Sequence, residues 1–219
     1  MNAQTLPIVS VVMPMFNNET TVEMALRNVL TQTFTHFEVI VVDDGSSDTT
    51  VDKVSAFNDP RIQLITQQRR GLAGARNTGI NAAKGKYIAL LDATDVWAPN
   101  KLQKHVDFLI ANPKVGVSYS ATQFVDEDGI DMGMGHYPTA GIVSAGHVFC
   151  CNPIGNTSAP VIRKETLDEV AVVTTEHGEY RKIYFDEGLT MFSDLDLWLR
   201  IALNCRWKIA GIDSALTFK

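Results

Sequence analysis

Four short apolar runs, separated by longer segments of mixed polarity, constrain the fold of this chain more than any other feature. The runs cover residues 8–13, 37–42, 62–65 and 87–91. The first run is rich in β-branched residues, which is typical of a strand buried on both of its faces. Strands that alternate with helices favour parallel βαβ units, so the first half of the chain predicts an α/β fold.

The spacing of apolar residues between these runs indicates helices. One stripe of apolar residues, with intervals of three and four, consists of Val22, Ala25, Leu26, Val29 and Leu30. Such a stripe is the face that an amphipathic helix packs against a sheet. Further helices are predicted after Asp48, over 71–83, from Pro99 onward and over 194–203.

The second half of the chain is less regular. Strands are predicted over residues 115–120 and 159–163. Residues 131–155 are rich in glycine and methionine and show no clear period, so we expect an irregular surface loop there. The sequence contains no internal repeat, low-complexity tract or linker, which favours a single domain over residues 1–219.

Composition excludes several classes of protein. The 219 residues include 19 lysines and arginines against 25 aspartates and glutamates, a formal net charge of −6. Nucleic acids and anionic lipids attract clustered positive charge, so nucleic acid is not an expected partner. No apolar run reaches the roughly 20 residues that span a bilayer. The cysteines Cys150, Cys151 and Cys205 lack the spacing of a metal site and are expected to be buried, reduced thiols of a cytoplasmic protein.

Several of the predicted strands are followed by residues that suit a binding site. Pro14 is expected to end the first strand, because proline cannot donate to a central ladder. Asp43 and Asp44 follow the second strand, and Asp92 follows the fourth. Ligands of open parallel sheets bind beyond the carboxyl ends of the strands. We therefore expect these residues to meet at one edge of the sheet.

Common nucleotide-binding motifs are missing from that edge. Residues 14–18 contain no glycine, so a pyrophosphate cannot approach the main chain as it does at a G-x-G-x-x-G turn. The sequence also lacks a G-x-x-x-x-G-K-[ST] P-loop and a G-x-S-x-G nucleophile elbow. Hydride transfer, P-loop phosphate hydrolysis and α/β-hydrolase chemistry are therefore not expected.

The carboxylates at the strand ends could bind a nucleotide or a cation. Asp43 and Asp44 can accept hydrogen bonds from a base or a ribose. Asp92, Thr94 and Asp95 stand where a hard divalent cation could bridge to a diphosphate. The alternative for each aspartate is a turn or helix-capping role.

Six segments together resemble family 2 inverting glycosyltransferases. They are Val9–Pro14, Gln32–Phe34, Phe37–Asp48, Gly71–Ile80, Gly85–Asp92 and Ser193–Arg200. The resemblance covers most of the chain and is weakest between residues 125 and 155. It implies a GT-A fold in one domain, mainly a parallel sheet flanked by helices. It also implies that residues 1–112 bind the nucleotide sugar and that residues 113–219 shape the acceptor side.

The resemblance further implies an activity. A hexosyl or N-acetylhexosaminyl group would pass with inversion from a nucleotide diphosphate, expected to be UDP, to a saccharide or lipid-linked acceptor in cell-envelope polysaccharide assembly. Such a protein would work in the cytoplasm, in peripheral contact with the inner face of the membrane. Members of the family usually continue beyond the point where this chain stops, so the chain is expected to be a near-minimal core, truncated on the acceptor side.

Site residues follow from the same resemblance. Asp44 would read the uracil N3–H, with the main chain near Pro14 and the side chain of Asp43 also at the nucleotide. Asp92 would begin the D-x-D motif beside the ribose and a Mg²⁺ or Mn²⁺ ion. Asp194 would be the catalytic base, since the acceptor hydroxyl must lose a proton as it attacks.

Two positions depart from the family pattern. Thr94 occupies the position whose carboxylate commonly binds the metal, so either Asp95 replaces it or metal binding is impaired. Ser193 stands where glutamate often precedes the base. Asp194 could instead complement the dipole of its helix, with Ser193 as the cap.

The sequence leaves an alternative function open and contains further polar residues near the predicted site. A catalytically impaired homologue that still binds nucleotide sugars is the alternative function. A sugar nucleotidyltransferase is disfavoured, because its triphosphate would need a glycine-rich loop after the first strand. Arg76 and Asn77 are expected to orient the loop at Asp92. For Arg69 and Arg70, a solvated surface is favoured over contact with a diphosphate.

Overall fold

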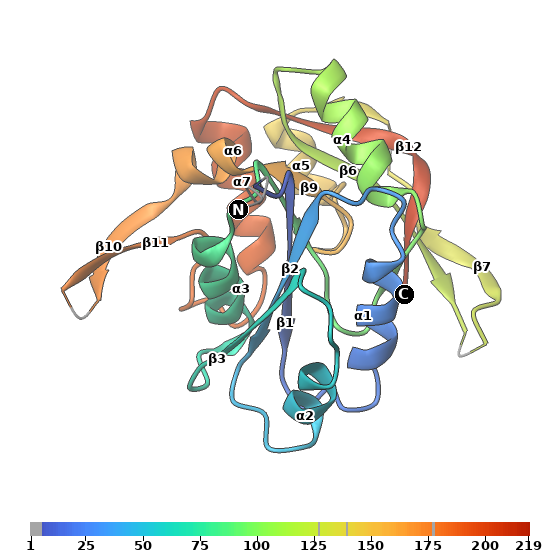
Figure 1. Ribbon diagram of the computed structural model, residues 1–219. Helices are drawn as coiled ribbons and strands as arrows, with labels where there is room; N and C mark the ends of the chain where they lie inside the picture. Colours follow the sequence, from blue (N-terminus) through green and yellow to red (C-terminus); the bar gives the residue numbers. More distant parts are fainter. Residues whose placement is uncertain (1–5, 127, 139, 177) are drawn as a thin grey trace.

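The computed structural model describes residues 6–126, 128–138, 140–176 and 178–219. Within these residues a mixed sheet of ten strands is covered by helices on both faces (Figure 1). The main path of the sheet runs in the order β3-β2-β1-β4-β9-β6-β12-β5, with β7 beside β6 and β8 beside β12. The expected α/β architecture is confirmed.

Most of the elements agree with the sequence pattern in the first half of the chain. The strands are β1 (Val9–Met15), β2 (Phe37–Asp43), β3 (Ile62–Thr66), β4 (Tyr87–Leu90), β5 (Val96–Trp97), β6 (Val115–Val125), β7 (Asp131–His136), β8 (Gly141–Val143), β9 (Val161–Arg163), β10 (Val172–Glu176), β11 (Glu179–Ile183) and β12 (Lys208–Phe218). The helices are α1 (Val22–Leu30), α2 (Thr50–Ser55), α3 (Gly71–Ala82), α4 (Lys101–Ala111), α5 (Ala145–Cys151), α6 (Lys164–Val170) and α7 (Ser193–Asn204).

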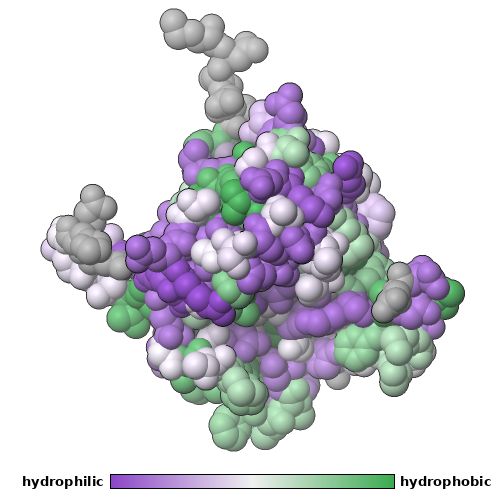
Figure 2. Space-filling view, turned by 90° about the horizontal axis from the view of Figure 1, so that it is seen from below, coloured by the Kyte–Doolittle hydropathy of each residue, from purple (hydrophilic) through white to green (hydrophobic). Residues whose placement is uncertain are grey.

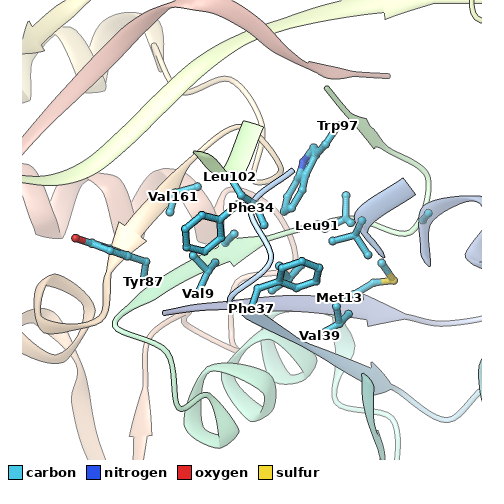
Figure 3. Packing of buried hydrophobic residues seen from close by; sticks show 14 of the residues in the cluster. Val9, Met13, Phe34, Phe37, Val39, Tyr87, Leu91, Trp97, Leu102 and Val161 are labelled. Atoms are coloured by element: carbon cyan, nitrogen blue, oxygen red, sulfur yellow. The ribbon is translucent and has the colours of Figure 1, made fainter. Parts of the chain in front are cut away.

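The strands β3, β2, β1 and β4 are parallel to one another and form the half of the sheet that the sequence predicts best. Alternate side chains of β1 enter different cores, which explains why the whole run is apolar. Val9 and Met13 pack with α1 and α4, together with Phe37 and Trp97 (Figure 3). Val12 packs on the opposite face with α3.

Pro14 does not end β1, so that expectation was wrong. The strand continues one residue further, and Pro14 lies opposite Val42 of β2. The main chain of Val12 faces β4, where its carbonyl accepts from the Leu91 amide. Pro14 comes two residues after Val12, so its nitrogen also faces the side of β4. The ladder between β1 and β4 ends at Leu90, so no residue of β4 pairs with Pro14. The missing N–H of proline therefore leaves no ladder bond unmade.

Residues 131–155 are more regular than expected. Where the structure describes them, β7 pairs with β6, β8 pairs with β12, and α5 packs against α7. Most side chains of β7 and β8 are exposed, so no apolar period marks these strands in the sequence. The antiparallel hairpin of β10 and β11 also went unpredicted, and it projects from the body of the molecule (Figure 1).

Two further expectations concern the environment of the chain. Cys150 and Cys151 are exposed free thiols, and Cys205 is a half-buried one. The expected burial was wrong because the last turn of α5 lies at the surface. In the part of the chain that the structure describes, no helix combines the length and the apolar character needed to cross a membrane.

Candidate functional site

A cavity of about 340 Å³ lies at the carboxyl edge of the parallel strands. Pro14, Asp44 and Asp92 line it, together with Phe16 and Thr94 from the loops that follow. The structure thus brings together residues from three separate strand ends, as the topology of a parallel sheet requires. Figure 2 views the molecule from this side, where hydrophilic residues cover most of the centre and hydrophobic ones gather along the lower margin.

Asp44 anchors the start of α3. One carboxylate oxygen accepts from Gln67 Nε2 at 2.7 Å and from the Arg70 amide at 2.8 Å, and the other accepts from the Gly71 amide at 2.7 Å. A carboxylate has about four lone-pair sites. Three are filled by protein donors, which leaves one for a ligand in the cavity.

Asp43 has a different place. It is buried, it is not among the residues that line the cavity, and its two oxygens accept from the Ser46 amide at 3.2 and 3.3 Å. The side chain therefore shapes the loop that follows β2. The structure separates the two neighbouring aspartates into a loop-forming residue and a cavity-lining one.

Phe16 and Arg69 form a stacked pair in the same cavity. The Arg69 guanidinium carbon lies 3.5 Å from the centroid of the Phe16 ring, within the range of a cation–π contact. Both residues line the cavity. The pair presents two planar groups beside Asp44, and neither was singled out as a planar surface from the sequence.

Asp92 also lines the cavity, and two donors fix its carboxylate. Arg76 Nη2 donates to one oxygen at 2.9 Å, and the Thr157 hydroxyl donates to the other at 3.3 Å. The Arg76 side chain is 4% exposed and that of Asp92 is 23% exposed. Arg76 thus orients Asp92 as expected. Asn77 does not, because its amide bonds to main-chain groups of residues 184 and 185 and to Glu187.

Asp95 is fully buried and is not among the residues that line the cavity. Burial and the charge of Asp92 raise the pKa of its carboxyl group. Oδ1 lies 3.3 Å from the Thr94 hydroxyl and 3.8 Å from Lys219 Nζ, and a hydrogen bond with the Ser158 side chain partly offsets the rise in pKa.

Of these two carboxylates, Asp92 lines the cavity and could face a divalent cation there, whereas Asp95 is buried behind it. The charge of a hard cation would offset the repulsion between Asp92 and Asp95. Within the described residues no three acidic, histidine or cysteine side chains form a metal-binding group. A cation here would therefore depend on a diphosphate for its remaining ligands, which is common for Mg²⁺.

A second cavity, of about 550 Å³, lies beside the first. Gly71 and Leu72, at the start of α3, line both cavities. Asp194 lines the second cavity, together with Asn156 and Thr157. The start of α3 is therefore the wall between a cavity that holds Asp44 and Asp92 and a cavity that holds Asp194.

The chain enters α7 through an unusual residue. Phe192 precedes the helix with φ 61° and ψ 17°, in the left-handed region. For a bulky residue this conformation costs about 1–2 kcal/mol. Its ring is 66% exposed and lines the second cavity, so burial does not offset the cost. The alternative interpretation of Asp194 included Ser193 as the helix cap. The structure does not show that cap, because Ser193 is already the first helical residue and no side chain caps this end.

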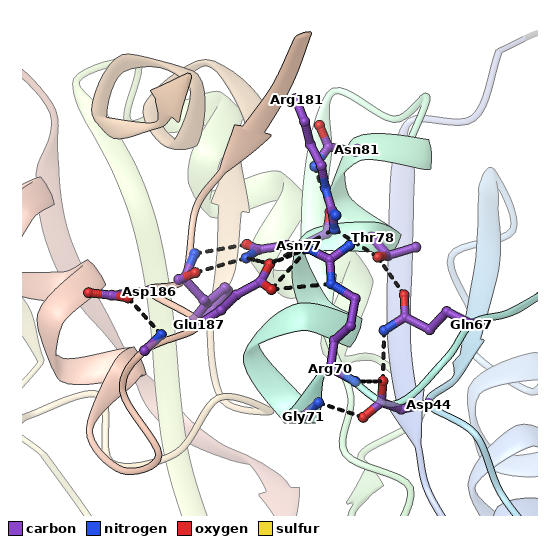
Figure 4. A network of polar contacts seen from close by, with 12 residues as sticks. Asp44, Gln67, Arg70, Gly71, Asn77, Thr78, Asn81, Arg181, Asp186 and Glu187 are labelled. Carbon is purple, nitrogen blue, oxygen red and sulfur yellow. Dashed lines mark hydrogen bonds and ion pairs between the residues drawn. The ribbon is translucent and has the colours of Figure 1, made fainter. Parts of the chain in front are cut away.

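Glu187, which sequence reasoning missed, connects the two cavities through Arg70 (Figure 4). Arg70 Nη2 lies 2.9 Å from Glu187 Oε2 and 3.0 Å from Oε1, and Asn77 Nδ2 donates to Oε1 at 2.9 Å. Both members of the ion pair line the second cavity. No sequence pattern pointed to Glu187, because the hairpin that precedes it was not predicted either. Arg70 was expected on a solvated surface, and the ion pair shows instead that it is held in the site.

Comparisons with known proteins identify the family of the chain. The family model described as Glycosyl transferase family 2 matches residues 10–164. The UDP-Glc:alpha-D-GlcNAc-diphosphoundecaprenol beta-1,3-glucosyltransferase WfgD of Escherichia coli is 39% identical over 124 residues, which are 56% of this chain and 49% of that protein. The putative teichuronic acid biosynthesis glycosyltransferase TuaG of Bacillus subtilis is 34% identical over 126 residues, which are 56% of this chain and 50% of that protein.

Solved structures show the same fold. S. aureus TarS 1-349 in complex with UDP-GlcNAc superposes with a TM-score of 0.75 at 22% identity, over 96% of this chain and 58% of that one. Mannosyltransferase PcManGT from Pyrobaculum calidifontis, in complex with GDP-Man and Mn2+, gives a TM-score of 0.70 at 21% identity, over 99% of this chain and 57% of that one.

The sheet order, the carboxylates at its edge and these likenesses define a protein of the GT-A fold. The chain belongs to glycosyltransferase family 2. It spans about half the length of the curated relatives reported above.

Proposed function

We propose that this chain binds a nucleotide sugar in the first cavity and transfers the sugar to an acceptor hydroxyl in the second. The observation that carries the proposal is the shared wall of Gly71 and Leu72, with Asp44 and Asp92 on one side and Asp194 on the other. A donor bound along this wall would place its base at Asp44 and direct its sugar toward Asp194. In this arrangement residues 1–112 provide the donor side and residues 113–219 the acceptor side.

The donor that we propose is a UDP-sugar. The remaining lone-pair site of Asp44 suits the N3–H of uracil, and the planar Phe16 and Arg69 offer apolar area to a base near Pro14. A volume of about 340 Å³ falls in the range of small-molecule sites. UDP-Glc in the name of WfgD and UDP-GlcNAc in the TarS complex support the same nucleotide.

The reaction that we propose is a single displacement with inversion. The acceptor oxygen forms a bond to the anomeric carbon while the bond from that carbon to the diphosphate breaks, and UDP leaves with the electron pair. Asp194 takes the proton of the acceptor hydroxyl. The competing role of Asp194, a carboxylate that complements the α7 dipole, needs no substrate.

A Mg²⁺ or Mn²⁺ ion held by Asp92 and Asp95 would stabilise the negative charge of the departing diphosphate. The repulsion between the Asp92 and Asp95 carboxylates and the Mn2+ in the PcManGT complex support this ion. Arg76 keeps the Asp92 carboxylate in place for either role, as a metal ligand or as a ribose contact.

For the acceptor we propose a saccharide or a lipid-linked sugar in cell-envelope polysaccharide assembly, and a hexosyl or N-acetylhexosaminyl group as the transferred sugar. The lipid-linked acceptor in the name of WfgD and the teichuronic acid in that of TuaG support this class. The reaction would then take place at the cytoplasmic face of the membrane, with the chain in peripheral contact with it.

A second function is favoured by one observation. Thr94 lines the donor cavity and offers a hydroxyl, a weak ligand for a hard cation, where the family commonly has a carboxylate. A homologue that binds nucleotide sugars with impaired catalysis would show this pattern.

Asp194→Asn separates the two functions. UDP-Glc, UDP-GlcNAc and GDP-Man are offered as donors, and UDP binding is followed by titration calorimetry. We expect transfer to fall at least a hundredfold while the Kd for UDP stays within twofold. Asp196→Asn, on the same turn of α7 and paired with Arg200, is the matched control. Unchanged transfer in Asp194→Asn contradicts the assigned base, UDP binding without transfer in the wild type favours the second function, and no binding of any of the donors or of UDP contradicts both.

A further inference from the structure

Phe192 stands in a backbone conformation that is unusual for a bulky residue. Among the described residues, the non-glycine residues with positive φ are Asn17, Asn152 and Phe192. Asparagine tolerates the left-handed region, whereas a bulky aromatic residue there is a true outlier. Glycine or asparagine at position 192 would remove the strain of the left-handed backbone. The presence of an aromatic side chain there therefore requires an explanation.

The fold does not supply that reason. The ring is 66% exposed, so it adds little to either core, and it cannot cap α7. The carbonyl of Phe192 accepts the first helical bond from Asp196, which any residue would do equally well. Backbone strain that contributes nothing to the stability of the fold is characteristic of functional sites.

The surroundings of the ring have a definite chemistry. Phe192 lines the second cavity two residues before Asp194, and Asn156, Thr157 and Glu187 line the same cavity. The ring thus adds a flat apolar surface to a set of hydrogen-bonding groups. A pyranose has matching surfaces, because its axial C–H groups form an apolar face while its hydroxyls project from the edge.

We propose that Phe192 is a specificity-determining residue, and that its ring is the surface on which the pyranose of the acceptor packs. Phe192 lines the same cavity as Asp194, so a sugar packed on its ring would present a hydroxyl to Asp194. This inference rests on the proposed function, and it adds the acceptor's sugar ring as the group that the second cavity recognises.

Phe192→Gly tests the inference, because glycine accepts the backbone and removes only the ring. We expect the Tm to rise by about 2–4 °C, the shift that about 1 kcal/mol produces in a chain of this size. The acceptor KM should rise at least tenfold, with the Kd for UDP unchanged. Phe192→Tyr, which keeps the ring, should retain the acceptor KM within about threefold. Asn152→Gly is the matched control, since it relieves a left-handed residue that is not among those lining this cavity.

The probes are methyl and octyl glycosides of glucose, N-acetylglucosamine, galactose and mannose, with UDP-Glc and UDP-GlcNAc as donors. Their binding in the presence of UDP is also followed by saturation-transfer NMR. An unchanged acceptor KM in Phe192→Gly overturns the inference, as does an equal change in Asn152→Gly. A loss confined to the octyl compounds assigns the ring to a lipid chain and overturns it too. A wild type that binds UDP but none of the glycosides overturns the inference alone, whereas a wild type that does not bind UDP overturns the proposed function with it.

Discussion

Arg70 and Glu187 are 117 residues apart in the sequence, yet they form a two-pronged ion pair, with Nε 3.2 Å and Nη2 2.9 Å from Oε2. The main-chain amide of the same arginine donates to Asp44 in the first cavity. One residue therefore connects the carboxylate of the proposed donor side to a carboxylate of the proposed acceptor side. The position of the wall between the two cavities depends on it.

Glu187→Gln should disturb the second cavity more than the first. The substitution removes the negative charge that faces both Arg70 and Arg181, at a cost of about 1–2 kcal/mol in the free energy of unfolding. We expect the acceptor KM to rise at least threefold and the Kd for UDP to stay within twofold, measured by transfer kinetics, calorimetry and urea unfolding. Asp168→Asn, which breaks an ion pair with Lys182, is the control. A weaker Kd for UDP at a constant acceptor KM would contradict this prediction.

Thr94→Asp should make nucleotide binding depend more strongly on metal. A carboxylate is a better ligand than a hydroxyl for a hard cation, and Thr94 already lines the donor cavity. UDP is titrated by calorimetry with Mn²⁺ and again with EDTA. We expect the ratio of the two Kd values to be at least threefold larger in Thr94→Asp than in the wild type, and Thr94→Asn serves as the uncharged control. Equal ratios in the two proteins would contradict a metal at this position.

Asp95→Asn should stabilise the metal-free protein at neutral pH. Burial and the charge of Asp92 raise the pKa of Asp95 above its usual value of 3.8, so the folded state holds this proton more tightly than the unfolded state. The stability that Asp95 contributes is fully present below the unfolded pKa and is lost as the pH rises through the folded pKa. The Tm of the wild type should therefore fall relative to Asp95→Asn as the pH rises above about 4.

Asp59→Asn provides a control of opposite sign for the same experiment. A side-chain hydrogen bond from Arg61 lowers the pKa of Asp59, so its contribution is present above 3.8 and is lost as the pH falls through the folded value. Calorimetric scans in EDTA from pH 3 to 8 compare the variants. Parallel curves for Asp95→Asn and the wild type would show that Asp95 is not under this strain.

Gly79→Ala should destabilise the protein. A Cβ at Gly79 in α3 would lie 2.3 Å from Val12 Cγ1 in β1, and forcing such a contact typically costs about 1–3 kcal/mol. Gly146→Ala in α5 is the control, because its Cβ would meet nothing closer than Ser144 Oγ at 3.8 Å. Alanine should there add up to about 1 kcal/mol of helix propensity. Urea unfolding measures both, and equal effects would contradict the close packing of α3 on β1.

The parts of the fold that the sequence predicted are those with two buried faces. β1 and β2 contact helices on both sides, so their composition alone identifies them as strands. β7 and β8 lie at the rim of the sheet with most side chains exposed, so their composition resembles that of a loop. Pro14 was misplaced as a strand end because the length of β4 decides whether its missing N–H costs a ladder bond, and that length is not visible at Pro14 itself.

The candidate site, too, has a part that could be predicted from the sequence and a part that could not. The meeting of Pro14, Asp44 and Asp92 follows from topology, and topology was predictable from the strand–helix alternation. The surroundings of Asp95 include Ser158 and Lys219, which are distant in the sequence, so no local pattern reveals its burial. Likewise, the partner of Arg70 is supplied by a distant loop, so Glu187 could not be assigned to the site from spacing.

The three hydrogen bonds that Asp44 accepts determine how its role must be tested. A substitution at this position detaches the first turn of α3, and with it the wall of both cavities, whether or not a nucleobase ever touches the carboxylate. Loss of activity in an Asp44 variant is thus the common outcome of two different causes. The informative change is in the ligand: UDP compared with N3-methyl-UDP alters one proposed hydrogen bond and leaves the protein intact.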